Sequence, residues 1–181
     1  MRMQDIKLTS HFKLSEFTAS RKAQEHGIVN VPGPEAVENL RKLCENTLEP
    51  LRVALGVPVI VTSGFRTKAL NDKLAHASST SQHMRGEAAD FYVGHTDTTD
   101  STEKGASTSS ATASHRELLI KAFREILTNP KIGFDQLILY PTFIHVSFVS
   151  KEKNRRGILK ARGDGKLGYG RLSLSDALKL V

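Results

Sequence analysis

The sequence has a single cysteine, Cys44, among 181 residues, and it has no tryptophan. One cysteine excludes an intrachain disulfide and a zinc site built from several thiolates. Any zinc site in this chain must therefore use histidine and carboxylate ligands. Aromatic residues make up only 6% of the chain, which argues weakly against a platform that stacks the bases of single-stranded nucleic acid.

Long apolar runs are also missing. No stretch approaches the roughly 18 uninterrupted apolar residues that a membrane helix needs. The amino-terminal residues MRMQDIKLTS contain no apolar signal-peptide core. We therefore expect a monomer without a transmembrane segment that is cytoplasmic as synthesised. The hydrophobic content of 39% and the length suit one domain, residues 1–181, with a single core.

Basic residues outnumber acidic ones, 26 against 19, and the net charge is +7. This balance favours an anionic partner such as nucleic acid, an anionic glycopolymer or an acidic membrane surface, and it does not choose among them. The basic residues are densest in KEKNRRGILKARGDGK, residues 151–166. This stretch, the densest part of a basic C-terminal segment of about 151–181, is interpreted either as a solvated tail or as a segment that docks on a negative surface.

Apolar periodicity and turn residues predict the elements. Helices are expected at 21–26 with Ser20 as cap, at 35–55 with a kink or end at Pro50, at 65–77, at 115–127, and near the C terminus with Ser173 or Ser175 as cap. Strands are expected at 57–64, after the SQHMRG loop, and in a hairpin over 134–149. Residues 94–114 are polar and of low complexity, so we expect a flexible insertion. The fold class is α+β, a small and mostly antiparallel sheet flanked by helices.

One histidine and one aspartate stand seven positions apart in SSTSQHMRGEAADFYVG, residues 78–94. His83 and Asp90 have a plain interpretation as surface-loop residues. They also suit a catalytic zinc, which commonly takes three protein ligands and keeps one position open. The best third candidate is His145, which sits in the apolar strand FIHVSF, although a hydrogen-bonded core histidine is the plain alternative there.

The stretch SGFRTKALNDKLAHASSTSQHMRGEAADF resembles the signature of the zinc D-Ala-D-Ala carboxypeptidases, the M15 peptidases. The matching residues are Ser63, Gly64, Phe65, Arg66, Asn71, Ser81, His83, Gly86, Ala88 and Asp90. IHVSF is similar to the strand that carries the third ligand of this family. FKLSEF, LEPLR and FDQLI resemble its phage-related branch, so the resemblance spans about residues 12–150.

The resemblance implies a hedgehog/DD-peptidase-like fold and one zinc ion held by His83, Asp90 and His145. Two histidines and one carboxylate also suit iron or manganese. Arg66 would bind the substrate and stabilise transition-state charge, the alternative being a surface salt bridge. Ser81 would contact the substrate or cap the turn before His83. The implied activity is hydrolysis of D-amino-acid peptide bonds in peptidoglycan stem peptides.

One position departs from the family pattern. Family members commonly carry Glu or Asp three residues before the third ligand, as general base, and this chain has Thr142 there. If the hairpin turns at 141–142, Ile138 lies opposite His145, and strand alternation then puts Gln136 on the face of the histidine as a candidate substrate-binding residue. Asp135, the nearest carboxylate on the adjoining strand, is the candidate base, although this register puts it off the face of the histidine and only a bulge or a longer loop would change that. The alternative is that Asp135 caps or braces the hairpin.

Glu87, beside the binding turn, is a weaker candidate for the base.

Three functions follow, of which the first is a zinc peptidase acting on the cell wall after release or export, as a carboxypeptidase or a phage-type endolysin. The second is a wall-binding module that keeps the fold and the metal but has lost catalysis. The third is a basic nucleic-acid-binding protein, whose binding would depend strongly on salt. We expect peptidoglycan stem peptides as partner and no nucleic acid.

Overall fold

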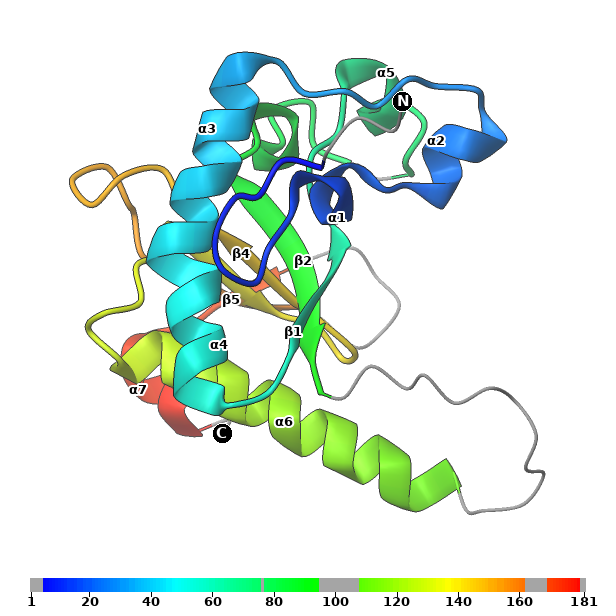
Figure 1. The fold of residues 1–181 in the computed structure, drawn as a ribbon. Coiled ribbons are helices and arrows are strands. Elements are labelled where there is room, and N and C mark those ends of the chain that lie inside the picture. The colour runs from blue at the N-terminus through cyan, green and yellow to red at the C-terminus, as the bar shows by residue number, and fades with distance from the viewer. Residues whose placement is uncertain (1–4, 76, 95–107, 162–168, 180–181) are drawn as a thin grey trace.

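The computed structural model describes residues 5–75, 77–94, 108–161 and 169–179, and these form an α+β fold around a six-stranded sheet (Figure 1). The strands are β1 (Val59–Ser63), β2 (Ala88–Val93), β3 (Gln136–Leu139), β4 (Ile144–Ser147), β5 (Gly157–Ala161) and β6 (Tyr169–Arg171). Their order across the sheet is β1-β2-β4-β3-β5-β6. Neighbours are antiparallel except β3 and β5, which are parallel, so the expected mostly antiparallel sheet is confirmed.

The helical elements are α1 (Leu14–Thr18), α2 (Arg21–Glu25), α3 (Pro34–Leu43), a π-helical turn η1 (Cys44–Leu48), α4 (Glu49–Leu55), α5 (Lys68–Asn71), a 3-10 turn η2 (Gln82–Arg85), α6 (Thr108–Thr128) and α7 (Leu174–Lys179). Of these, α3, α4 and α6 supply most of the helical part of the core on one face of the sheet. Figure 1 shows α3 and α4 end to end in front of the sheet. Among the described residues, none of the helices combines the length and the apolar character needed to cross a membrane.

The long helix expected over 35–55 is present, and its irregularity lies just before Pro50. Proline has no amide hydrogen, so the carbonyl four residues earlier, that of Asn46, receives no helical hydrogen bond from it. The chain widens into η1 at this point, and the Asn46 carbonyl instead accepts a bond of 2.9 Å from the amide of Gly133. The irregular turn thereby ties the helical column to the segment that leads into β3.

Two other helices, α5 and α6, differ in extent from the expected ones, whereas α2 matches its expected range to within one residue. Helix α2 begins after Ser20, whose hydroxyl accepts from the Ala23 amide as expected. The helix expected over 65–77 is limited to α5. Helix α6 begins at Thr108, seven residues before the expected start, so part of the stretch interpreted as a flexible insertion is helical; residues 95–107 of that stretch lie outside the described ones.

The basic C-terminal segment is not a solvated tail where the structure describes it. Residues 157–161 pair in parallel with β3, residues 169–171 pair with β5, and α7 contacts α6. Ser173 caps α7 by accepting a bond of 3.1 Å from the Asp176 amide, as one of the two predicted caps. The tail interpretation failed because the β5 apolar residues are few and are interrupted by lysine.

Side chains of the central strands alternate between a core face and an open face. Residues of the core face pack against the helices: Ala89, Phe91, Leu137, Leu139, Ile144 and Val146 from the strands, with Leu40, Leu43, Leu51, Phe123 and Ile126 from α3, α4 and α6. Asp90, Ile138 and His145 take the alternate positions and stay outside this cluster. The helices therefore leave free the face that carries the polar residues.

Candidate metal centre

Two of the candidate ligands lie side by side because of strand register. Asp90 on β2 is directly opposite His145 on β4, and His145 is in turn opposite Ile138 on β3, as the sequence predicted. Ser63 on β1 is opposite Asp90. Directly opposed residues project from the same face of a sheet, so one row across four strands brings the carboxylate and the imidazole together.

The third candidate, His83, comes from η2, which precedes β2. This turn ends at Gly86, whose φ of +71° is in the left-handed region. A Cβ atom on Gly86 would lie 2.3 Å from the carbonyl oxygen of Ala36, so only glycine permits this approach of η2 to α3. The close contact fixes where the His83 side chain enters the site.

The ring of His83 has a defined orientation and tautomer. Its Nδ1 lies 2.6 Å from the carbonyl oxygen of Gly64. A carbonyl oxygen only accepts hydrogen bonds, so Nδ1 must carry the proton, and the lone pair of Nε2 is left for a ligand. A Cβ atom on Gly64 would lie 2.6 Å from backbone atoms of Phe17, which explains the glycine at this point of the motif.

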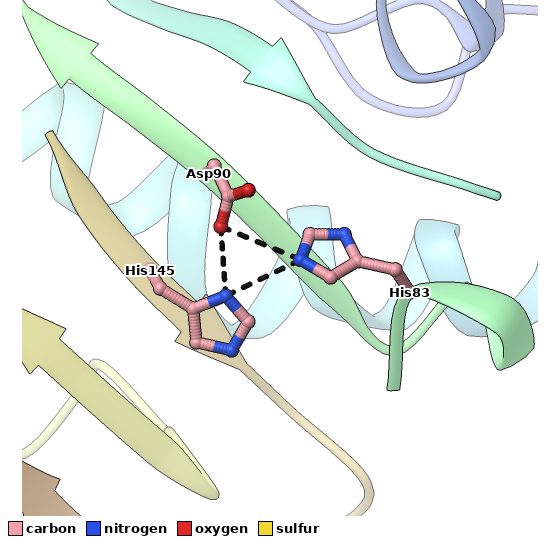
Figure 2. A group of neighbouring side chains, drawn as sticks. All are labelled: His83, Asp90 and His145. Carbon is pink, nitrogen blue, oxygen red and sulfur yellow. Dashed lines mark hydrogen bonds and ion pairs between the residues drawn. The ribbon is translucent and has the colours of Figure 1, made fainter. Parts of the chain in front are cut away.

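The three ligand atoms converge, as Figure 2 shows. His83 Nε2 lies 3.4 Å from Asp90 Oδ1 and 3.3 Å from His145 Nδ1, and Asp90 Oδ1 lies 2.7 Å from His145 Nδ1. Ligands of a tetrahedral zinc ion with bonds near 2.0–2.1 Å are separated by about 3.3 Å. Two of the three separations match that value, and a set of two imidazoles with one carboxylate is typical of zinc. The residues present therefore fit a metal ion.

Burial and charge favour the protonation states that a metal needs. Burial lowers the pKa of His83 and thereby favours its neutral form, which is the form that ligates. Burial alone would raise the pKa of Asp90, but the neighbouring His83 and His145 outweigh it and hold this pKa far below its usual range. The site thus combines a neutral imidazole with an ionised carboxylate.

Arg66 forms an ion pair with the carboxylate of Asp90, one of the three candidate ligands. Its Nη2 donates to Asp90 Oδ2 at 3.1 Å, and its Nε and Nη2 lie 3.2 and 3.1 Å from the hydroxyl of Ser63. Its side chain is only 14% exposed, so this is not the surface salt bridge considered as the alternative. Burial lowers the pKa of Arg66 and Asp90 opposes that effect; a guanidinium keeps its charge in either case.

A cleft of about 870 Å³ opens above the three ligands, and the candidate substrate-binding residues line it. Ser81 lies on its wall, and the Ser81 hydroxyl makes no capping bond, so the alternative role as a turn cap is not seen. Buried Asn71 of the motif donates at 3.0 Å to the carbonyl of Ser78 and so holds the loop before Ser81. Gln136 projects into the cleft from β3, as alternation predicted.

Tyr140 also lines the cleft and was not among the residues predicted from the sequence. Counting by twos along β3 from Gln136 through Ile138 leads to Tyr140, so the alternation rule contained the signal. The Tyr140 ring stacks on that of Phe143 with centroids 4.2 Å apart and 12° between the planes. This stack gives the cleft a rigid aromatic wall beside the row of ligands.

Asp135, the predicted base, lies at the edge of the cleft and is only 1% exposed. Arg155 donates to it from Nε at 2.9 and 3.1 Å and from its amide at 2.7 Å, and Gln82 Nε2 donates at 3.0 Å. Burial would raise the pKa of Asp135, but these bonds lower it overall. Such a carboxylate is a weak base, so its catalytic role stays a prediction. No local sequence pattern pointed to Arg155, which belongs to the segment interpreted as a tail.

Neither Glu87, the weaker candidate for the base, nor Thr142, which stands where the family commonly carries the base, lines the cleft. Glu87 is bound by Arg85, with 2.9 Å to Nε and 2.7 Å to Nη2. Thr142 is exposed at the hairpin turn, where its carbonyl oxygen lies 2.9 Å from the ring of His115. Within the described part of the chain, the carboxylates lining the cleft are those of Asp90 and Asp135.

A family model described as Peptidase M15 matches residues 10–113, more than half of the chain. No curated protein and no solved structure matches. The matched part contains Arg66, His83 and Asp90, whereas His145 lies beyond it and joins them through the register of β2 and β4. On this match and this geometry, the chain belongs to the peptidase M15 family.

Proposed function

We propose that this protein is a zinc peptidase that hydrolyses D-amino-acid peptide bonds of peptidoglycan stem peptides, as a D-Ala-D-Ala carboxypeptidase or as a phage-type endolysin. The observation that supports it best is the convergence of His83, Asp90 and His145 on the floor of a cleft, with Arg66 against them. The M15 family contributes the class of reaction.

A zinc ion held by these three side chains would act as a Lewis acid toward a peptide carbonyl and would make water a nucleophile near neutral pH. The chain's own contribution is to fix the ligands. The carbonyl of Gly64 orients His83, and Arg66 orients Asp90. Such outer hydrogen bonds commonly change metal affinity by about 10- to 100-fold.

Arg66 has a second task in this proposal. Its Nε and Nη2 are bound to Ser63 and Asp90, and no bond from its Nη1 to a described residue is seen. The guanidinium lines the cleft with its charge intact. It is therefore placed to donate to a substrate carbonyl whose oxygen gains negative charge in the transition state.

The remaining polar groups of the cleft suit a peptide. Ser81 and Gln136 offer a hydroxyl and an amide to main-chain groups of the substrate, and the Tyr140–Phe143 stack offers an apolar surface. The net charge of +7 favours approach to an anionic wall. We propose that the protein acts there as a monomer after release or export.

A second function is supported by the lack of an available base. Both carboxylates of the described cleft lining are engaged, Asp90 by Arg66 and Asp135 by Arg155, and Thr142 points its side chain to solvent at the turn. The alternative is a wall-binding module that keeps the metal and the fold without turnover. Metal content is the same in both cases, so only product formation separates them.

The test is mass spectrometry of peptidoglycan incubated with the zinc-loaded protein, beside a chelator-treated sample and a His83→Ala variant. Metal-dependent release of D-Ala supports the carboxypeptidase, and release of a stem or cross-link fragment supports the endolysin. Intact peptidoglycan, with zinc verified by elemental analysis and the protein still pelleting with the wall, would support the binding module.

A further inference from the structure

The rim of the cleft toward β5 is positively charged. The loop from Val149 to Arg155, between β4 and β5, carries Lys151, Lys153 and Arg155. Lys153 and Arg155 line the cleft, and Lys151 does not. These residues lie outside the part of the chain matched by the family model.

The loop is held in place by its own hydrogen bonds and by Asp135. The Val149 amide donates to Asn154 Oδ1 at 2.9 Å, and the Lys153 amide donates to Ser150 Oγ at 3.2 Å. The Arg155 amide donates to Asp135 Oδ1 at 2.7 Å. Buried Asp135 therefore anchors the loop, so that Lys153 starts from a fixed backbone position at the rim.

The charges of the cleft do not balance. The lining contains four cationic side chains, those of Arg66, Arg85, Lys153 and Arg155, and two carboxylates. Arg66 pairs with Asp90, Arg155 with Asp135, and Arg85 with Glu87 outside the lining. Lys153 has no ion-pair partner within the described residues, and it is exposed to the open cleft. A ligand that fills this end must bring a negative group to be complementary.

We propose that the 149–155 loop recognises a carboxylate of the substrate, with Lys153 as the contacting residue and Arg155 beside it. The substrate class is then an acidic peptide, and the inference rests on the proposed peptidase function. The carboxylate has two sources, the side chain of an acidic residue or the C terminus of the peptide. The first source goes with cleavage inside the stem peptide, and the second with removal of its last residue.

Two variants and four peptides test this proposal. Lys153→Gln removes the rim charge, and Lys151→Gln is the matched control, because it makes the same charge change in the same loop outside the cleft. Arg155 is left intact because it anchors to Asp135. The peptides are a synthetic stem pentapeptide with a free acidic side chain and a free C terminus, its two singly amidated forms, and the doubly amidated form.

Affinity is measured by calorimetry with the zinc-loaded protein, and the recovered peptide is checked for cleavage by mass spectrometry. Where cleavage occurs, KM and kcat from initial rates replace Kd. We expect Lys153→Gln to weaken binding of the free pentapeptide by about two- to fivefold, the effect of one charge pair at an exposed rim. Lys151→Gln should leave it unchanged.

The amidated peptides identify the carboxylate. One amidated form lacks the recognised carboxylate. The unaltered protein should bind that form as weakly as the Lys153→Gln variant binds the free pentapeptide. For that form, Lys153→Gln should cause no further loss of affinity. Equal effects of Lys153→Gln and Lys151→Gln, equal affinity for all four peptides, or no binding up to millimolar concentration would overturn the proposal. Because Kd needs no turnover, absence of cleavage counts against the peptidase function alone.

Discussion

Arg66 Nη2 donates to Oδ2 of Asp90 at 3.1 Å, while Oδ1 of the same carboxylate lies 2.7 Å from His145 Nδ1. The two oxygens thus have separate partners: Oδ2 accepts a hydrogen bond from Arg66, and Oδ1 faces the two histidines. The ion pair is largely shielded, with the two side chains 14% and 15% exposed. Because this ion pair lies beside the proposed reaction centre, the orientation of Asp90, a candidate metal ligand, is coupled to that of Arg66, which we propose contacts the substrate.

Arg66→Ala is expected to lower kcat by at least about 100-fold, because it removes a charged donor from the place where the carbonyl oxygen gains charge. At saturating zinc the variant should still bind one ion, since all three ligands remain. The measurement is initial rates beside zinc titration against a chelator. Arg66→Lys is the control that keeps the charge but not the fork of donors. Unchanged kcat in Arg66→Ala would remove this residue from the mechanism.

His83→Ala and His145→Ala are each expected to reduce bound zinc well below one ion per chain, because each removes one of three converging ligand atoms. Elemental analysis after dialysis measures this, and His26→Ala, an exposed histidine at the end of α2, is the control. Stoichiometric zinc in both site variants would disprove the ligand assignment.

Asp135→Asn is expected to destabilise the metal-free protein by about 1.5–3 kcal/mol at pH 7, the usual contribution of hydrogen bonds to a charged group. Glu152→Gln, an exposed carboxylate in the same loop, should change stability little. Urea unfolding measures both. Equal stability of Asp135→Asn and the unaltered protein would mean that the Arg155 contact does not hold the loop.

The effect of Asp135→Asn should also depend on pH. The pKa of Asp135 is lower in the folded protein than its ordinary value, because hydrogen bonds from Arg155 and Gln82 outweigh the effect of burial. Its ionised form therefore stabilises the fold above the unfolded pKa of about 3.9, and this stabilisation is lost as pH falls through the folded pKa. The difference from the unaltered protein should shrink in unfolding experiments repeated toward pH 3. A difference that grows on acidification would contradict the direction of this shift.

Gly86→Ala is expected to cost about 3 kcal/mol of folding stability, from the left-handed φ together with overpacking against α3. The added Cβ would lie 2.3 Å from the Ala36 carbonyl oxygen, which belongs to a helix and cannot move aside cheaply. Gly33→Ala, where a Cβ meets no atom within 4 Å and φ is −73°, is the control. Similar melting temperatures for the two variants would show that η2 does not pack on α3 in this way.

The sequence predicted those parts of the fold whose signals are local. Alternation and the 141–142 turn were sufficient to place Ile138 opposite His145, which is the register found. The pairing of β5 with β3 was missed, because a parallel pair joins distant segments and β5 contains one strong apolar pair, Ile158 and Leu159, beside Lys160. The early start of α6 was missed for a related reason, since its first turn consists of small residues that are mostly polar and contains no large apolar side chain.

The residues of the candidate site likewise divide into those that a local sequence pattern predicted and those that it did not. The motif residues around His83 and Asp90 were recognisable because their spacing is short and fixed. The contact between Arg155 and Asp135 joins residues 20 positions apart through a loop, and no spacing rule reaches it. Its consequence for Asp135 is considerable, because a residue read as a base is found as the anchor of a loop.

If His83, Asp90 and His145 bind a metal as proposed, the row from Ser63 through Asp90 and His145 to Ile138 makes metal affinity depend on the alignment of the strands. If β4 slipped by one residue against β2, an isoleucine or a valine would replace the imidazole beside Asp90, because side chains alternate along a strand. An ion that binds only the aligned sheet stabilises it by RT ln(1 + [L]/Kd) and disfavours every slipped pairing. Metal binding would thus select the correctly aligned pairing of β2 and β4 over slipped pairings during folding.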